Sequence, residues 1–414
     1  MRKMRDSGIA WIGVIPQDWE IVRTKSLYCS AKEIAGDRAD DFERLALTLN
    51  GVIKRSKEDS VGLQPEKFSG YQILKKGELV FKLIDLENVA TSRVGLSPYT
   101  GIVSPAYIVL SKQSRAKDLV VRYSMYHFLS MWQREVFNQM GDNGVRSSLN
   151  AKELLNIPHP FPSIYEQKRI VTFLDAQCAE IDAVLEKTRA SIEEYKKLKQ
   201  AVITQAVTKG IRGDRPMKDS GIEWIGDIPA EWRKTQLRHC AAIKSGITLG
   251  KKYEKTDSLV ERPYLRVANV QDGYVDLSVL TTIEVTQDED LKYRLRAGDV
   301  LMTEGGDRDK LGRGCVWHGE IEPCLHQNHI FAVQTSKDTL LPEFLEYLTV
   351  SDVGRSYFDV TAIKTTNLAC TSSSKVLAFT IPLPSVEEQA EIVEALNTKC
   401  AGIDALVAKK QQYL

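Results

Sequence analysis

The chain has 414 residues, a formal net charge of +1 at pH 7, 43% hydrophobic residues and 27% charged residues. The length suffices for two or more domains of ordinary globular composition. No run of about 18 apolar residues occurs and the first residues lack an apolar core, so we expect neither a membrane span nor an export signal. The seven cysteines include no Cys-x-x-Cys pair, which indicates reduced thiols and a cytoplasmic location. The small net charge does not exclude nucleic-acid binding, because a local patch matters more than the sum.

The chain opens with a segment rich in glycine, tryptophan and proline, residues 4–19, which returns as residues 217–232. The two copies read MRDSGIAWIGVIPQDW and MKDSGIEWIGDIPAEW. Their glycines and prolines argue against a regular helix or strand and predict a compact turn that packs its tryptophans onto a larger body. We interpret each copy as a structural staple, because tryptophans in turns more often anchor packing than chemistry.

Each staple is followed by a divergent stretch of about 140 residues. Short alternating runs with glycine turns predict small mixed sheets in both stretches. A helical segment follows in each, at residues 118–139 and 341–357. Faint matches align residues 45–52, LALTLNGV, with 264–270, YLRVANV, and residues 74–82, LKKGELVFK, with 295–303, LRAGDVLMT.

A long amphipathic helix is predicted over residues 163–208. Pro162 and Ser163, with Glu166 three residues later, indicate a helix start with a capping box, and Gly210 indicates its end. Such a helix would be ~70 Å long and needs a partner for its apolar seam. The seam has the heptad spacing of a coiled coil: Leu174, Cys178, Ile181, Leu185, Thr188, Ile192 and Tyr195.

The partner helix is predicted over residues 384–414, which repeat the first helix at a constant offset. The start signal, the glutamine, the seam cysteine and an aspartate all recur in one register, which indicates internal duplication. Leu414 aligns with Ile192, so the second helix has no counterpart of residues 193–208. The sequence therefore leaves open how the last third of the first helix is paired.

The order of staple, divergent domain and helix, twice over, resembles the specificity subunit of type I restriction-modification enzymes. The resemblance is carried by SGIAWIGVIPQDW, PFPSIYEQ, IPLPSVEEQ, YLRVANVQDGYVDLS and RAGDVLMTEGG, and it covers essentially the whole chain. It implies an α+β protein with two α/β target-recognition domains, separated by two long helices that form an antiparallel coiled coil in a pseudo-two-fold repeat. The expected parts are residues 1–160 (staple and first recognition domain), 161–210 (central helix), 211–383 (second staple and recognition domain) and 384–414 (shortened C-terminal helix).

The resemblance also implies a function. The chain would be a non-catalytic, DNA-binding subunit that recognises a bipartite, asymmetric target in double-stranded DNA. It would dock two methyltransferase subunits, and a restriction and translocase subunit would join them. S-adenosylmethionine, ATP and magnesium are expected on those partners and not in this chain.

One polar loop in each divergent domain suits contact with DNA. Residues 304–313, EGGDRDKLGR, offer cations for phosphate or guanine, and their glycines allow close approach of the backbone. The aligned loop of the first domain is residues 83–93, LIDLENVATSR. The candidates are Arg308, Lys310, Arg313, Asn88, Thr91, Ser92 and Arg93. A solvated charged turn is the competing interpretation, because Glu304, Asp307 and Asp309 cancel the cations.

A second loop precedes each long helix, at residues 141–150, GDNGVRSSLN, and 364–374, KTTNLACTSSS. Amides, hydroxyls and a cation can pair with bases or phosphates. The candidates are Asn143, Arg146, Lys364, Thr365 and Asn367. Helix-capping loops are the competing interpretation, because caps need the same residue types.

Signatures of catalysis are missing. The sequence contains no GxxxxGK[ST] phosphate loop and no glycine-rich fingerprint for S-adenosylmethionine, so no catalytic or cofactor-binding residue is assigned. Two cysteines and three histidines fall within residues 315–329, but their spacing fits no common zinc finger, and we favour buried thiols and hydrogen-bonded histidines.

The alternative function is a coiled-coil scaffold that binds proteins without reading DNA. The small net charge favours it slightly. Two divergent domains in matched positions favour DNA, because a scaffold has no evident need for two different readers.

Overall fold

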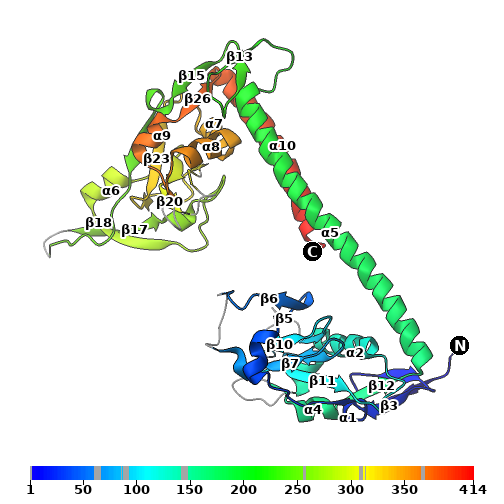
Figure 1. Ribbon diagram of the computed structural model, residues 1–414. Helices are drawn as coiled ribbons and strands as arrows, with labels where there is room; N and C mark the ends of the chain where they lie inside the picture. The colour runs from blue at the N-terminus through cyan, green and yellow to red at the C-terminus, as the bar shows by residue number, and fades with distance from the viewer. Residues whose placement is uncertain are drawn as a thin grey trace. The chain divides into compact units, whose positions relative to one another are not determined.

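Two compact units make up the chain, residues 1–183 (unit 1) and residues 184–414 (unit 2). The helix α5 (Ile164–Lys209) begins in one unit and ends in the other (Figure 1). The computed structural model describes residues 2–59, 67–84, 86, 93–140, 148–254, 258–306, 311–312, 314–364 and 369–414. No helix within these ranges is both long and apolar enough to cross a membrane.

Unit 1 consists of short strands and short helices before α5. The elements are β1 (Met4–Asp6), β2 (Val14–Pro16), β3 (Glu20–Arg23), α1 (Thr24–Leu27), β4 (Tyr28–Cys29), η1 (Gly36–Asp41), β5 (Arg44–Thr48), β6 (Gly51–Arg55), η2 (Phe68–Gly70), β7 (Gln72–Leu74), β8 (Leu79–Phe81), β9 (Val94–Leu96), β10 (Gly101–Val103), β11 (Ile108–Lys112), α2 (Val121–Gln133), α3 (Val136–Met140), α4 (Ala151–Asn156) and β12 (Pro158–Phe161).

Unit 2 repeats this organisation, and several of its strands are longer. Its elements are β13 (Met217–Asp219), β14 (Asp227–Pro229), β15 (Arg233–Gln236), η3 (Leu237–His239), β16 (Ala241–Ser245), β17 (Leu259–Leu265), η4 (Val267–Asn269), β18 (Thr281–Thr286), α6 (Gln287–Tyr293), β19 (Val300–Thr303), β20 (Gly305–Gly306), β21 (Gly314–Val316), β22 (Leu325–His326), β23 (Ile330–Thr335), α7 (Pro342–Val350), α8 (Asp352–Thr361), β24 (Ile363–Lys364), β25 (Ala369–Cys370), α9 (Ser373–Ala378), β26 (Thr380–Leu383) and α10 (Val386–Gln411).

Two sheets of unit 1 have counterparts in unit 2 with corresponding strand orders. The antiparallel sheet β4-β11-β8-β9 corresponds to β16-β23-β19-β21. The set β6-β5-β10 corresponds to β18-β17-β22, and each set combines one antiparallel with one parallel pair. The predicted matches are therefore confirmed, because β8 and β19, like β5 and β17, occupy equivalent places.

The helical segment predicted in each domain is divided in two. In unit 1, α2 and α3 are separated at Glu135, whose φ of 55° breaks the helix. In unit 2, Ser351 ends α7 and caps α8 by accepting a hydrogen bond from the amide of Gly354. On α2, Phe128 is fully buried against Phe81 of β8.

Each staple is a small antiparallel hairpin pinned to a long helix through its second tryptophan. The indole Nε1 of Trp19 donates to Glu166 Oε2 at 2.9 Å, and that of Trp232 donates to Glu388 Oε2 at 2.9 Å. The predicted anchoring of tryptophans onto a larger body is confirmed. The expectation that the staples contain no regular strand is wrong, because each staple has two paired strands of three residues, β1 with β2 and β13 with β14. Glycines with positive φ, such as Gly13, allow the chain to reverse direction between these strands.

The glutamate and the glutamine that follow each helix start make different contacts. Glu166 does not complete the predicted capping box: the hydroxyl of Ser163 accepts from its amide at 3.4 Å, but its carboxylate binds the staple. The buried amide of Gln167 accepts from the backbone of Val120 and donates to the carbonyls of Asp118 and Pro162. In unit 2, Gln389 makes the same contacts with Leu341, Thr339 and Pro384.

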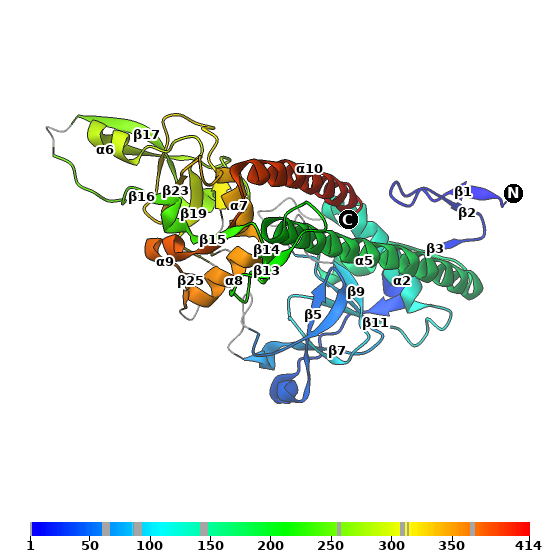
Figure 2. The ribbon, with the colours of Figure 1, turned by 90° about the horizontal axis from the view of Figure 1, so that it is seen from above.

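The last third of α5 packs antiparallel to α10, side by side in both views (Figures 1 and 2). Ile203, Ala206 and Val207 are buried in one cluster with residues of α10 and of the second staple. Lys199 Nζ reaches both carboxylate oxygens of Asp404, at 2.8 and 2.7 Å. This answers the question that the sequence left open, because the start of α10 covers the end of α5. Gly210, with φ of 74°, ends α5 as predicted.

Candidate nucleic-acid interface

In unit 1, the first residues of one loop predicted to contact DNA lie beside the last residues of the other. Ile84, in the first loop, forms an antiparallel bridge with Ser148, in the second. The backbone amide of Leu149 donates to the carbonyl of Leu83 at 2.9 Å. Sequence-distant segments are thereby held together at one edge of the domain.

The same arrangement recurs in unit 2. The amide of Thr371 donates to the carbonyl of Glu304 at 2.7 Å. Beyond this bond, β20 pairs with β25, which in turn pairs with β24. Both units therefore bring their two predicted loops together through equivalent backbone hydrogen bonds, although the loops differ in sequence. Two adjacent loops on a rigid sheet are a common platform for recognition.

A close backbone approach explains one glycine of the second loop pair. A Cβ added to Gly305 would lie 3.0 Å from Cys370 Sγ and 3.2 Å from the carbonyl oxygen of Ala369. The glycine was expected to allow close approach to DNA. In the structure it allows close approach of β20 to β25.

Most of the individual candidates lie outside the described residues. This holds for Asn88, Thr91, Ser92, Asn143, Arg146, Arg308, Lys310, Arg313, Thr365 and Asn367. For Lys364, the structure describes the backbone, which lies in β24. Arg93 is fully buried immediately before β9.

Helix capping accounts for part of each second loop. Asn150 accepts from the amides of Lys152 and Glu153 and caps α4, with Glu153 completing a capping box. Ser372 accepts from the amide of Lys375 and caps α9. The capping interpretation thus holds for these end residues, and it leaves the candidate residues of the loops untested.

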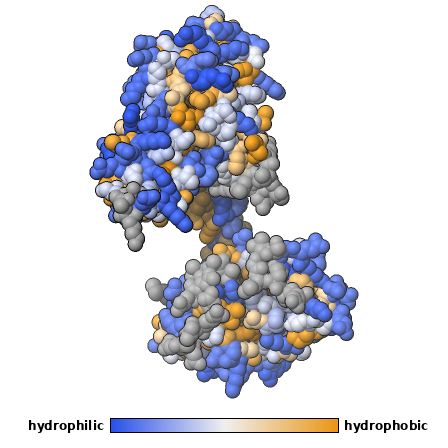
Figure 3. Space-filling model, turned by 90° about the vertical axis from the view of Figure 1, so that its left-hand side faces the viewer, coloured by the Kyte–Doolittle hydropathy of each residue, from blue (hydrophilic) through white to orange (hydrophobic). Residues whose placement is uncertain are grey.

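The described side chains next to the loops include both polar and apolar residues. His329 Nδ1 lies 2.5 Å from Glu304 Oε2, so Glu304 is engaged outside the loop. Ile84 is 40% exposed and Ile363 61% exposed. Elsewhere, hydrophilic side chains dominate the face of each unit seen in Figure 3.

The cysteines and histidines of residues 315–329 do not form a ligand set. Burial raises the pKa of Cys315 and of Cys324 to about 12, which disfavours the thiolates that a metal needs. Burial lowers the pKa of His326 to about 4, and its Nδ1 lies 3.0 Å from the carbonyl of Ile330. Among the described residues, no three His, Cys, Asp or Glu side chains are placed to hold a metal ion.

Asp290 is part of a buried ion cluster. Its carboxylate lies 3.0 Å from a guanidinium nitrogen of Arg262 and 2.6 Å from one of Arg294. Burial alone would raise the pKa of Asp290, but hydrogen bonds from Arg262 and Arg294 outweigh it and lower that pKa. Because both arginines bind this carboxylate, we interpret Asp290 as a structural residue.

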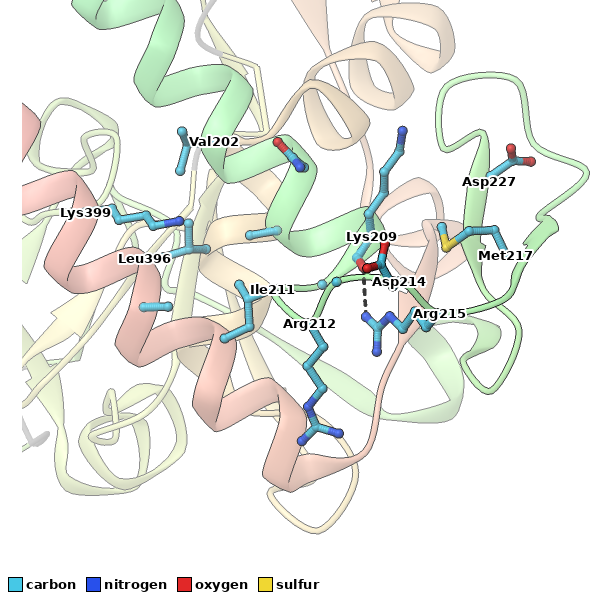
Figure 4. A pocket seen from close by; sticks show the side chains of 15 residues that line it. Val202, Lys209, Ile211, Arg212, Asp214, Arg215, Met217, Asp227, Leu396 and Lys399 are labelled. Atoms are coloured by element: carbon cyan, nitrogen blue, oxygen red, sulfur yellow. Dashed lines mark hydrogen bonds between the residues drawn. The ribbon is translucent and has the colours of Figure 1, made fainter.

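A cavity of about 460 Å³ opens where α5 ends beside α10 (Figure 4). Its arginines are already paired, Arg212 with Glu391 at 2.7 Å and Arg215 with Glu388 at 2.6 Å. Arg215 also donates to the carbonyl of Lys209 at 2.8 Å. The cavity therefore belongs to the junction between the helix and the staple, not to the convergent loops.

No family model matches the chain. The type I restriction enzyme MjaVIII specificity subunit of Methanocaldococcus jannaschii is 25% identical over 411 residues, which are 96% of this chain and 89% of that protein. The EcoKI specificity subunit of Escherichia coli is 26% identical over 264 residues, 61% of this chain and 52% of that protein. This chain is related to type I specificity subunits.

Other comparisons agree with this relationship. A putative MjaX specificity subunit of Methanocaldococcus jannaschii is 27% identical over 175 residues, 42% of this chain and 40% of that protein. The chain thus spans about half or less of the length of two of these three specificity subunits. A solved structure concerned with complex assembly and conformational transition of the type I R-M system shares the fold, with a TM-score of 0.65 and 16% identity over 96% of this chain and 94% of that chain. All three relatives are named as specificity subunits of type I restriction enzymes.

Proposed function

We propose that this chain is the DNA-recognition component of a type I restriction-modification complex, in which each unit reads one half of a bipartite, asymmetric target. The observation that carries the proposal is the convergence of two loops in each unit on equivalent backbone hydrogen bonds. Equivalent positions with different side chains suit two readers of different half-sites. The relationship to specificity subunits supports the same reading.

The proposed complex supplies the chemistry. Two methyltransferase subunits dock on this chain in the cytoplasm, and a restriction and translocase subunit joins them. S-adenosylmethionine, ATP and magnesium act on those partners, since no sequence motif for holding them was found here. Adenine methylation by the partner requires the target base to leave the stack, and this chain supplies position and orientation.

Methylation mapping tests the proposal. Genomic DNA is compared between cells that carry this chain with its neighbouring methyltransferase and cells that lack this chain alone. An interrupted, asymmetric methylated motif that disappears with the deletion is the expected result. If methylation does not change and the purified chain has no salt-dependent affinity for DNA, the protein-scaffold alternative replaces the proposal.

Single substitutions in the loops assign each unit to its half-site. Arg308→Ala should cost ~1 to 3 kcal/mol of binding on targets that keep the unit 2 half-site, if Arg308 reads a base. Arg146→Ala should do the same for the unit 1 half-site. An equal loss on every DNA sequence, with a smaller salt dependence, would instead make either residue a phosphate contact.

A further inference from the structure

A tight turn of unit 2, residues 271–274, is fixed beside the first of the two convergent loops. The amide of Gln271 donates to the carbonyl of Tyr274 at 3.0 Å and closes the turn. The amide of Gly273 donates to the carbonyl of Gly314 at 3.3 Å. Gly314 begins β21 and directly follows loop 304–313 in the chain. The turn therefore lies against the end of a loop that was predicted to contact DNA.

A buried asparagine makes the connection that carries this turn rigid. The side-chain amide of Asn269 donates to the carbonyls of Asp276 and Val279 at 2.7 and 2.9 Å. Its carbonyl oxygen accepts from the amide of Arg266 at 2.8 Å, and Asn269 is only 4% exposed. Backbone on both sides of the turn is thus held by one side chain. Side chains on a fixed frame of this kind are well placed for recognition.

Helix α8 packs against the same loop. A Cβ added to Gly312 would collide with the ring of Phe358, which is fully buried on α8. Arg355 lies one turn before Phe358 on this helix, and its guanidinium is 4.0 Å from the carboxylate of Asp272. The turn, the end of the loop and α8 are therefore neighbours. We call Asp272, Tyr274 and Arg355 the turn surface.

The turn surface presents a phenol and a guanidinium to solvent. Tyr274 is 59% exposed and the side chain of Arg355 is 51% exposed. The pair of Arg355 with Asp272 is long and exposed, and such pairs contribute little to stability. A phosphate can therefore take the guanidinium at small cost. Arginine and tyrosine are both residue types that bind phosphate oxygens in protein–DNA complexes.

We propose that Tyr274 and Arg355 contact the DNA backbone beside the half-site that unit 2 reads, an inference that rests on the proposed function. The guanidinium of Arg355 turns from Asp272 to one phosphate, and the hydroxyl of Tyr274 donates to a phosphate oxygen. These contacts lie outside both convergent loops. They position the duplex without reading its sequence, because every base pair carries the same phosphates.

DNA binding by the full chain tests the proposal. Fluorescence anisotropy is measured at several salt concentrations with a duplex that carries the methylated motif and with a scrambled duplex. Arg355→Ala should weaken binding to both duplexes by about tenfold and lower the slope of log affinity against log salt by about 1. Tyr274→Phe removes only the hydroxyl and should weaken binding to both by about threefold.

The matched control is Arg296→Ala. Arg296 is also an exposed arginine of unit 2, but it precedes β19, whereas loop 304–313 follows that strand. This variant should bind both duplexes as the unaltered chain does. A loss equal to that of Arg355→Ala would overturn the proposal, because it would show that any exposed cation of the unit has the same effect.

Asp272→Asn distinguishes a phosphate contact from a structural role of Arg355. If Arg355 binds phosphate, removal of the competing carboxylate should tighten binding to both duplexes by about threefold. If Arg355 only holds the turn through Asp272, this variant should weaken binding as Arg355→Ala does, and the proposal is overturned. Unchanged binding in both Arg355→Ala and Tyr274→Phe also overturns it. An unaltered chain that binds neither duplex would instead refute the proposed function.

Discussion

Acidification from about pH 7 to about pH 5 should loosen unit 1 and leave unit 2 nearly unchanged. In unit 1, the rings of His127 and His159 lie 4.6 Å apart between centroids. Burial lowers the pKa of His127 to about 4, and burial and then the neighbouring His127 lower the pKa of His159 well below its usual value. In unit 2, burial lowers the pKa of His326 to about 4, and burial with the nearby Glu343 raises that of Glu346 to about 7.

The direction in which stability changes with pH at a buried histidine follows from proton binding. The unfolded chain takes up the proton below its usual pKa of 6.5, whereas folded His127 does so only near 4. Its contribution to stability is fully present above about pH 6.5 and is lost as the pH falls toward 4. For these two pKa values the loss between pH 7 and pH 5 is about 2 kcal/mol. His159 adds to the loss in the same direction.

Glu346 acts in the opposite direction. Its carboxyl stays protonated up to about pH 7 in the folded protein and only to 4.5 in the unfolded chain, so stability is lost as the pH rises through this window. Acidification from pH 7 to pH 5 restores about 2 kcal/mol, which offsets the loss at His326. The net change expected in unit 2 is close to zero.

Hydrogen exchange followed by mass spectrometry measures both units in one sample. After correction for the intrinsic pH dependence of exchange, the opening free energy of β8 and β11 should fall at pH 5, while that of β19 and β23 should hold. The matched control is Glu346→Gln, which removes the offset and should make unit 2 lose about 2 kcal/mol. Equal losses in both units of the unaltered chain, or no loss in unit 1, would refute the reasoning.

Three other substitutions address the anchors of the fold. Glu388→Ala should lower the free energy of unfolding of unit 2 by about 1 to 3 kcal/mol in denaturant, because the buried indole of Trp232 loses its acceptor. The Arg215 guanidinium loses one carboxylate and keeps Glu231 and the carbonyl of Lys209. Glu166→Ala should cost clearly less, since its pair with Arg2 is more exposed, and equal costs would contradict this. Gln167→Ala should lower the free energy of unfolding by about 3 kcal/mol or more, because three backbone groups lose their hydrogen-bond partner. A loss under about 1 kcal/mol would show that water replaces the side-chain amide. Gly305→Ala should separate β20 from β25 and weaken DNA binding while the melting temperature changes little; unchanged binding would show that the close approach to Cys370 is tolerated.

Repetition made much of the fold predictable. The heptad spacing indicated the long helix, Gly210 its end, and the glycine turns the matching strands, because each of these depends on local conformation. The second helix of each domain was missed as a separate element. Its start depends on one residue, Ser351 in unit 2, whose capping role is indistinguishable in sequence from that of any other serine.

Contacts between distant segments were less accessible. The alignment placed Leu414 beside Ile192, but helices that pair antiparallel place the start of one on the end of the other, so the aligned residue is not the contact partner. Arg93 carried a cation at the end of a polar loop, and only the tertiary packing around β9 buries it. The bond between Leu149 and Leu83 uses backbone atoms alone and has no sequence signal.

The distinction between side-chain and backbone anchors accounts for the pattern of similarity along the chain. Staple and helix are joined through an indole, a carboxylate and an amide, and those residue types recur identically in both units: Trp19 and Trp232, Glu166 and Glu388, Gln167 and Gln389. The convergent loops are joined through backbone N–H and C=O groups, which every residue except proline supplies. Side chains in the loops are therefore free to differ without loss of the anchor. A scaffold that fixes its frame by side chains and its loops by backbone can change what it binds while it keeps its fold.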